Sequence, residues 1–151
     1  MIVEGRRSAP LETGGVLTGY WAETGDEAIV TEVVGPGPRA VHERSRFRPD
    51  TEYHEAEVAR IYLASGRVHT YLGDWHTHPD GGSYLSAADL ATLRRISHSH
   101  EARAPNALML VLGNRGDEWT VGGWAAPLNG VFPWRRSRPR IVRIRLTHGI
   151  R

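Results

Sequence analysis

An uninterrupted apolar run, ALMLVLG at residues 107–113, most constrains how this chain can fold. A strand with one solvated face alternates apolar and polar residues, whereas this run is apolar at every position. It therefore predicts a central strand that is buried on both faces. The run is far shorter than the roughly 20 apolar residues that cross a bilayer as a helix, and no other stretch approaches that length.

Shorter patterns elsewhere supply the elements that would surround this strand. Five further segments are rich in β-branched and aromatic residues or alternate in polarity, and we expect strands at 14–21, 28–34, 68–78, 118–126 and 140–146. No internal repeat and no linker divides the chain. We therefore expect a single domain, residues 1–151, of the α/β class: a central mixed β-sheet flanked by helices.

Two helices are expected to cover the sheet. Asp50 is a suitable N-cap for the first, at 51–66, which Gly66 would end. The second is expected at 86–96. Their periodicity predicts inward-facing residues at Val58, Ile61 and Tyr62 in the first helix and at Leu90 and Leu93 in the second.

Charge is unevenly distributed along the chain. Residues 1–130 contain twelve Arg against seventeen acidic residues, a net of −5, whereas residues 131–151 contain seven Arg and no acid, a net of +7. Within 140–146 Arg alternates with apolar residues, which favours an exposed edge strand. The alternative is a docking surface for an acidic partner such as nucleic acid. Because aromatic residues hardly interleave with the Arg residues of the Arg-rich C-terminal segment, residues 131–151, nucleic acid is not the expected partner.

The composition limits the available chemistry. A chain of 151 residues that is 40% hydrophobic and 24% charged is typical of a soluble globular protein with one core. The absence of Cys excludes disulfides, thiolate ligands and a cysteine nucleophile, so any metal must be held by His, Asp or Glu. The first residues, MIVEGRRSAPLETGG, lack the apolar core of a signal peptide, and we expect a cytoplasmic protein.

Polar groups gather in the stretch GDWHTHPDGGSYLSAADL, residues 73–90. On a strand, His76 and His78 project to the same side, and two such imidazoles can both reach one ion at about 2.0–2.1 Å. Ser86 and Asp89 are three apart at the start of the expected helix and are therefore neighbours.

The seven residues that join these two pairs, 79–85, contain one Pro and two Gly, so the chain can reverse there and bring the helix start to the strand end. His76, His78 and Asp89 would then offer three ligands and leave a fourth position for water, the pattern of a catalytic zinc site. Each half alone has a simpler explanation: a His-x-His pair is common on exposed strands, and Ser-x-x-Asp is also a helix cap.

The combined spacing, His76-x-His78, seven residues, then Ser86-x-x-Asp89, resembles the motif of the JAMM metalloproteases, also called MPN-plus or JAB-domain proteins. That family has a glutamate ahead of a glycine-rich strand, and here Glu12 precedes the segment 14–21. The resemblance covers about residues 11–124 and is closest to the bacterial stand-alone type. Many members have Pro before the serine where this chain has Leu85, a departure that affects loop shape and not the ligands.

The resemblance implies a JAB/MPN fold, which is similar to that of cytidine deaminases, and one Zn²⁺ per chain held by His76, His78 and Asp89. Glu12 would act as the general base and then the acid, and Ser86 would donate to the oxyanion. The implied substrate is a ubiquitin-like protein or its conjugate, cleaved at an amide bond at its C-terminus by deconjugation or precursor processing. The implied context is a bacterial conjugation or antiviral operon.

Two other functions stay open at this stage. The fold also occurs in members that have lost ligands, so the chain could be a binding scaffold without catalysis. The start of the motif, HTHPD, is also similar to the His-x-His-x-Asp motif of metallo-β-lactamases, but the further His of that motif is replaced by Gly81. The sequence does not indicate an oligomeric state.

Residues around the motif have less specific expectations. Trp75 should pack beneath the site, on the face opposite to His76, and Asp74 and Asp80 should either support the ligands or be solvated. Gly122 and Gly123 indicate a bulge or a close approach of backbone. The second His-x-His pair, His98 and His100, is expected to be solvated. No role is assigned to four isolated histidines: His42, His54, His69 and His148.

Overall fold

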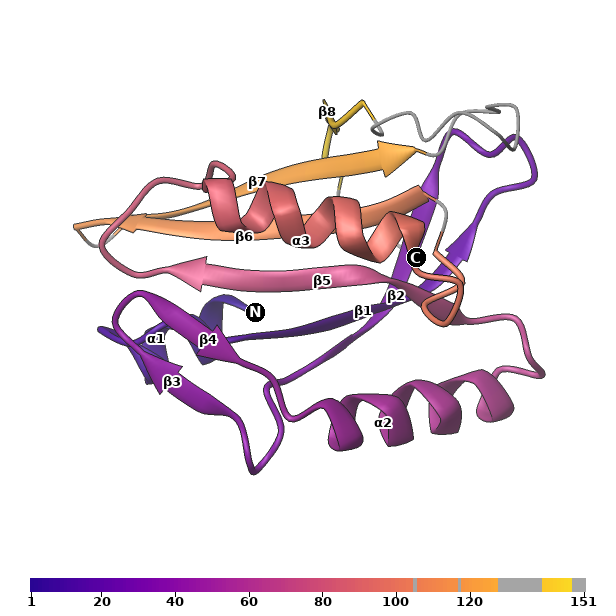
Figure 1. Cartoon of the computed structure of the whole chain (residues 1–151), viewed down its shortest axis with the longest axis horizontal. Coiled ribbons are helices and arrows are strands. Elements are labelled where there is room, and N and C mark those ends of the chain that lie inside the picture. Colours follow the sequence, from indigo (N-terminus) through magenta and orange to yellow (C-terminus); the bar gives the residue numbers. More distant parts are fainter. Residues whose placement is uncertain (105, 117, 128–139, 148–151) are drawn as a thin grey trace.

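The computed structural model describes residues 1–104, 106–116, 118–127 and 140–147 (Figure 1). The helices within these ranges are α1 (Ile2–Ser8), α2 (Thr51–Ala64) and α3 (Ala87–His98). The strands are β1 (Gly14–Trp21), β2 (Ala28–Val34), β3 (Val41–Glu43), β4 (Arg46–Arg48), β5 (Thr70–His78), β6 (Asn106–Arg115), β7 (Glu118–Pro127) and β8 (Val142–Arg143).

Six strands form one sheet in the order β2-β1-β5-β6-β7-β8, and β3 and β4 form a separate hairpin. β5 and β6 run parallel, while the other pairs in the sheet are antiparallel. The expected α/β fold with a mixed central sheet is therefore confirmed. The apolar run 107–113 lies in β6, between β5 and β7, and is buried along its whole length.

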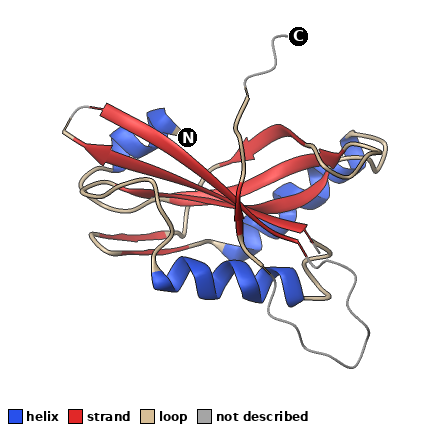
Figure 2. Cartoon of the chain, turned by 90° about the horizontal axis from the view of Figure 1, so that it is seen from above, coloured by secondary structure: helices blue, strands red, loops and turns tan. Residues whose placement is uncertain are grey.

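α2 and α3 pack on the same face of the sheet. Ile61 of α2 packs with Val16, and Leu93 of α3 packs with Met109. Val16 and Met109 are both register partners of Asp74 on β5, so their side chains share one face. We call the face that α2 and α3 cover the helical face. Seen from above, the twisted strands form a layer with helices on either side (Figure 2).

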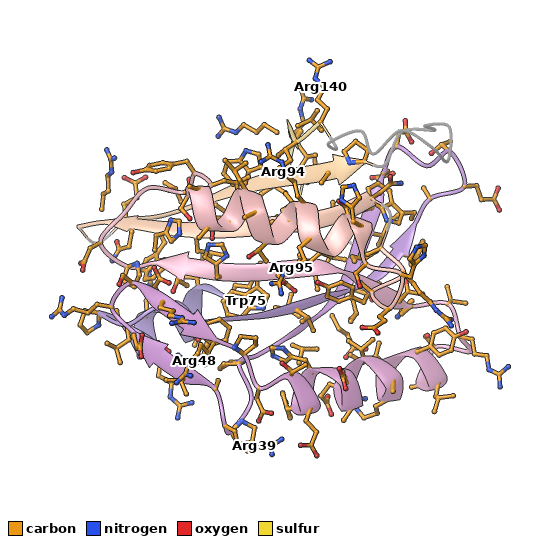
Figure 3. All side chains as sticks on the ribbon, in the orientation of Figure 1. Arg39, Arg48, Trp75, Arg94, Arg95 and Arg140 are labelled. Atoms are coloured by element: carbon orange, nitrogen blue, oxygen red, sulfur yellow. The ribbon has the colours of Figure 1, made fainter. Side chains whose placement is uncertain are left out.

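The opposite face carries a second core cluster, which is built from Leu17, Leu72, Trp75, Leu108, Leu110, Leu112 and Ala125. α1 lies over this face, because Gly5 is close to the ring of Trp119 and to Thr77. Figure 3 shows Trp75 among the strands, while Arg39 and Arg140 project outward. No helix among the described residues has the length and apolar character needed to cross a membrane.

Two short features were not foreseen in the sequence. They are α1 and the β3–β4 hairpin, whose strands are three residues long. The hairpin is attached to the segment before β1, because the Glu12 N–H donates to the Glu43 carbonyl over 2.8 Å. Such short elements depend on tertiary contacts and leave little periodic signal in the sequence.

The expected strand at 140–146 is much shorter in the structure. Only Val142 and Arg143 pair with β7, followed by one hydrogen bond from the Ile144 N–H to the Gly123 carbonyl. Val142 and Ile144 pack on the core, but Leu146 is 44% exposed, so the expected buried face ends early. The rest of the Arg-rich segment, 131–139 and 148–151, lies outside the described residues.

The boundaries of α2 and α3 agree closely with expectation. The Asp50 side chain accepts from the Tyr53 N–H and caps α2, and Ser86 caps α3. Tyr62 was wrongly expected to face inward and is 37% exposed. The inward-facing line of α2 instead runs through the buried His54, the half-buried Val58 and the buried Ile61, at spacings of four and three residues.

Candidate metal centre

The two histidines of β5 meet at the end of the strand. His76 and His78 share the helical face, and their Nε2 atoms lie 3.2 Å apart. Only 12% and 15% of their side chains are exposed. The period of two residues along β5 therefore brings both imidazoles to one point, as expected.

The first turn of α3 adds a carboxylate to this point. Asp89 Oδ1 lies 3.2 Å from His76 Nε2, and Asp89 Oδ2 lies 3.4 Å from His78 Nε2. A capping box fixes the carboxylate: it accepts from the Ser86 N–H at 2.7 Å, while the Ser86 hydroxyl accepts from the Asp89 N–H at 3.2 Å. Ser86-x-x-Asp89 is thus both a helix cap and part of the site.

His76, His78 and Asp89 could together hold a metal ion. Donor atoms bound at about 2.0–2.1 Å around a tetrahedral zinc lie about 3.3–3.4 Å from one another. The two imidazole nitrogens lie 3.2 Å apart, close to the edge of such a tetrahedron, and they lie 3.2 and 3.4 Å from the two different oxygens of the Asp89 carboxylate. A four-coordinate ion held by these three residues would have one position left for a further ligand.

The loop after β5 fixes the ring of His78. Its Nδ1 lies 3.1 Å from the Gly82 carbonyl oxygen. A carbonyl oxygen can only accept, so in the neutral ring this contact places the hydrogen on Nδ1 and leaves the Nε2 lone pair directed toward Asp89 and His76, whereas the protonated ring also donates from Nε2 to Asp89. An imidazole held in this tautomer is prepared to bind a metal through Nε2.

The charges of the centre are strongly coupled. Burial disfavours ionisation of Asp89, but hydrogen bonds from His76 and His78 outweigh burial and hold the pKa of Asp89 well below its usual range. The hydrogen bond to Asp89 raises the pKa of the His78 imidazole, against the effect of burial. Protons and a metal cation therefore compete for the same atoms.

Glu12 lies beside this group, two residues before β1. Gly14 pairs with His76, and the Thr77 N–H donates to the Thr13 carbonyl at 2.8 Å, so the register continues to place Glu12 opposite His78. Burial raises the pKa of the Glu12 carboxyl, while the nearby His78 and His76 act to lower it. The structure thus brings Glu12 and Ser86 together with the three potential ligands.

The structure adds partners that the sequence did not reveal. His42, on β3, lies with its Nδ1 2.9 Å from the Glu12 carbonyl oxygen, so the hairpin helps to position the segment that carries Glu12. The Gly82 carbonyl is the second such partner. Neither partner could be recognised from the sequence. His42 contacts a backbone atom of Glu12, and the partner that Gly82 provides is itself a backbone carbonyl.

The residues flanking the motif take different roles. Trp75 is 1% exposed on the face opposite to His76, as expected, and its indole N–H donates to the Val34 carbonyl at 2.9 Å. Asp74 accepts a 2.7 Å hydrogen bond from the Tyr71 hydroxyl, and its carboxyl group is close enough to the His76 ring for their charges to interact. Asp80 is solvated, with a side chain 74% exposed and 3.7 Å from Arg44.

The other histidines lie apart from the centre. His98 and His100 are exposed, as expected. His54 is buried and its Nε2 lies 2.8 Å from the Gly35 carbonyl oxygen, while His69 contacts Thr31. His148 lies outside the described residues.

Comparisons with known proteins agree with this geometry. The model of a family described as prokaryotic homologs of the JAB domain matches residues 1–122. The probable metalloprotease y4qB of Sinorhizobium fredii is 40% identical over 129 residues, which cover 85% of this chain and 78% of that protein. A protein of Vibrio cholerae named CD-NTase/cGAS isopeptidase is 33% identical over 108 residues, which cover 72% of this chain and 65% of that protein.

A solved structure shares the fold. The solution structure of a protein from Desulfitobacterium hafniense superimposes with a TM-score of 0.64 at 18% sequence identity, covering 95% of this chain and 82% of that one. At this level of identity the likeness concerns the fold.

Proposed function

The chain belongs to the family of prokaryotic JAB-domain proteins, and from that membership we propose that it is a JAMM-type zinc peptidase. Its substrate would be an amide bond at the C-terminus of a ubiquitin-like protein, either an isopeptide bond in a conjugate or a peptide bond in a precursor. Relatives named metalloprotease and isopeptidase support a hydrolase role.

One observation carries the proposal: two imidazole nitrogens of β5 and the Asp89 carboxylate of α3 converge within 3.2–3.4 Å of one another, with a second carboxyl group beside them. His76, His78 and Asp89 would hold the ion, which the donor set of two imidazoles and one carboxylate suits. When bound, zinc lowers the pKa of a water ligand to about 7 and polarises a carbonyl group.

Glu12 is the residue proposed to move protons. It would accept a proton from the attacking water as the C–O bond forms, and then return it to the nitrogen of the leaving amine as the amide C–N bond breaks. A general base works best when its pKa approaches the working pH, and burial shifts the pKa of Glu12 in that direction.

Ser86 is proposed to stabilise the oxyanion that develops on the scissile carbonyl. Its hydroxyl oxygen already accepts from the Asp89 N–H, so its own hydrogen remains available to donate. The capping box holds this hydroxyl at the start of α3, and a donor fixed in advance costs little reorganisation during the reaction.

The two other functions fit less well. A scaffold without catalysis would not need two imidazoles, a carboxylate and Glu12 to converge. In a site of the metallo-β-lactamase type the carboxylate of the His-x-His-x-Asp motif would belong to the centre. Here that residue, Asp80, is exposed and faces Arg44, while Asp89 occupies the place beside the histidines.

The proposal can be tested with two defined substrates. One is a ubiquitin-like protein joined through its C-terminal carboxyl to a lysine of a reporter peptide, and the other is the same protein extended by a linear peptide. We expect about one zinc per chain, cleavage of at least one substrate, and loss of cleavage with a chelator that zinc reverses. Protein that neither contains nor takes up zinc, or loaded protein that cleaves neither bond, contradicts the proposal.

A further inference from the structure

We infer that Gly113 of β6 and Gly122 of β7 form a seat for the loop that carries Gly82, and that this seat sets the affinity of the centre for metal through His78. The inference rests on the metal site of the proposed function. It makes the two glycines positioning residues: they touch neither metal nor substrate and act through the Gly82 carbonyl.

The loop backbone lies directly on both glycines. A Cβ on Gly113 would stand 2.3 Å from the Ser83 nitrogen and 2.4 Å from the Gly82 carbonyl carbon. A Cβ on Gly122 would stand 2.1 Å from the Ser83 carbonyl oxygen. These are backbone atoms, so a methyl group cannot be accommodated by rotation of a side chain and the loop itself must move.

The two glycines form one continuous surface on the helical face. Val111 pairs with Gly122, and Gly113, two residues further along β6, pairs with Thr120. Gly113 and Gly122 are therefore diagonal neighbours on adjacent strands. Next to them the Thr120 hydroxyl donates to the Ser83 hydroxyl at 3.1 Å and fastens the loop to the sheet.

Strand stability does not account for these glycines. Glycine weakens a strand interior, because it costs backbone entropy and offers no side chain to pack. Gly113 nevertheless ends the apolar run 107–113 at the position that pairs with His78. The close approach of Ser83 and Gly82 supplies the reason.

Through the Gly82 carbonyl, the seat affects the ring of His78. Gly82, whose carbonyl accepts from Nδ1 of His78 at 3.1 Å, is held between Gly81 and Ser83, both of which approach Gly113. A displaced loop would move that carbonyl and release the ring of His78. Outer partners of metal-bound histidines typically contribute about 10- to 100-fold to metal affinity.

Gly113→Ala is the main test variant, because its three nearest atoms all belong to the loop backbone. Gly123→Ala is the matched control: it lies on the same sheet, but its Cβ would meet only side-chain atoms of Ile144, Leu146 and Leu110 on the other face. Gly35→Ala is a second control, since nothing lies within 4 Å of its Cβ. Gly122→Ala would also contact the Trp124 ring and serves as a supporting variant.

The measurements are zinc affinity, by competition with a chromogenic chelator, and exchange of the His78 Nδ1–H with solvent in the zinc-loaded protein, by NMR. Gly113→Ala should bind zinc about 10- to 100-fold more weakly and exchange this hydrogen faster, while both controls resemble the wild type. If Gly113→Ala does not fold, Thr120→Val, which removes only the exposed link to Ser83, should show the same changes to a smaller degree.

Two results separate the inference from the proposed function. Wild-type protein that binds no zinc contradicts the metal site itself. Wild-type protein that binds zinc, together with Gly113→Ala or Thr120→Val variants whose affinity and hydrogen exchange match those of Gly123→Ala, overturns the seat and leaves the metal site intact.

Discussion

Thr13 and Thr77 are joined by three hydrogen bonds between the segment that carries Glu12 and the strand that carries the histidines, the weakest from the Thr77 hydroxyl to the Thr13 carbonyl at 3.4 Å. The Thr77 N–H donates to the Thr13 carbonyl at 2.8 Å, and the Thr13 N–H donates to the Thr77 hydroxyl at 3.0 Å. Both residues are completely buried. Because Glu12 precedes Thr13 and Thr77 lies between His76 and His78, this pair sets the position of the carboxyl group relative to the imidazoles.

Thr77→Val keeps the shape of the side chain and removes both the acceptor for the Thr13 N–H and a weak donor to the Thr13 carbonyl. A buried donor without a partner costs about 1–3 kcal/mol, so the free energy of unfolding should fall by that amount in urea denaturation. Thr70→Val, on the exposed start of the same strand, should change it by less than about 0.5 kcal/mol. Equal stability of the two variants would show that the buried link is dispensable.

His78→Ala should abolish tight metal binding, because it removes one of three converging donors. The loss in zinc affinity should exceed the roughly 10- to 100-fold that removal of an outer partner costs. His98→Ala is a fair control, since His98 also belongs to a His-x-His pair but is exposed on α3. Calorimetric titration of the metal-free proteins distinguishes them, and an unchanged affinity in His78→Ala would remove this residue from the centre.

Glu12→Gln separates catalysis from metal binding. The amide has nearly the same shape and cannot take up the proton, so turnover should fall by about 10²–10⁴ while zinc content stays near one per chain. Glu43→Gln, on the neighbouring hairpin, should be close to wild type because only its backbone carbonyl contacts Glu12. Full turnover in Glu12→Gln would mean that another group acts as the base.

The local parts of the centre could be predicted from the sequence. The spacing of His76 and His78 follows from the period of a strand, and the spacing of Ser86 and Asp89 from the first turn of a helix. The buried strand at 107–113 follows from its uninterrupted apolar composition. In each case the pattern and the contact lie within a few residues, so the sequence alone contains the relevant geometry.

The long-range parts could not be derived in this way. Glu12 approaches His78 because β1 pairs with β5, and the Thr13–Thr77 link joins residues that are 64 apart in the sequence. Only the resemblance to a known motif pointed to Glu12. The support from His42 and Gly82 left no signal, because hydrogen bonds to backbone atoms do not depend on the residue type of the acceptor.

Ser86 has two roles that different substitutions can separate. Ser86→Ala should lose both the cap, at about 0.5–2 kcal/mol of stability, and the oxyanion donor, at about 10²–10³ in kcat. Ser86→Gly should lose the same factor in kcat but only a few tenths of a kcal/mol, because glycine is tolerated at the N-cap. Thermal unfolding and steady-state kinetics on both variants test this, and a Ser86→Gly variant with normal kcat would assign Ser86 to the cap alone.

Zinc binding should depend on pH in a way set by His78. Its pKa is raised above the ordinary value of 6.5, chiefly because the protonated ring donates to Asp89, so between pH 6.5 and the raised pKa the metal-free centre holds a proton that zinc must displace. This proton stabilises the metal-free fold fully below pH 6.5, and the contribution is lost as the pH rises through the raised pKa.

Zinc affinity should follow the opposite course, rising with pH over the same interval and levelling off above it. Calorimetry in two buffers of different ionisation enthalpy should detect proton release at a pH just above 6.5, in wild type and in His98→Ala alike. Binding without buffer-dependent heat would show that His78 is already neutral and that the contact with Asp89 does not hold a proton.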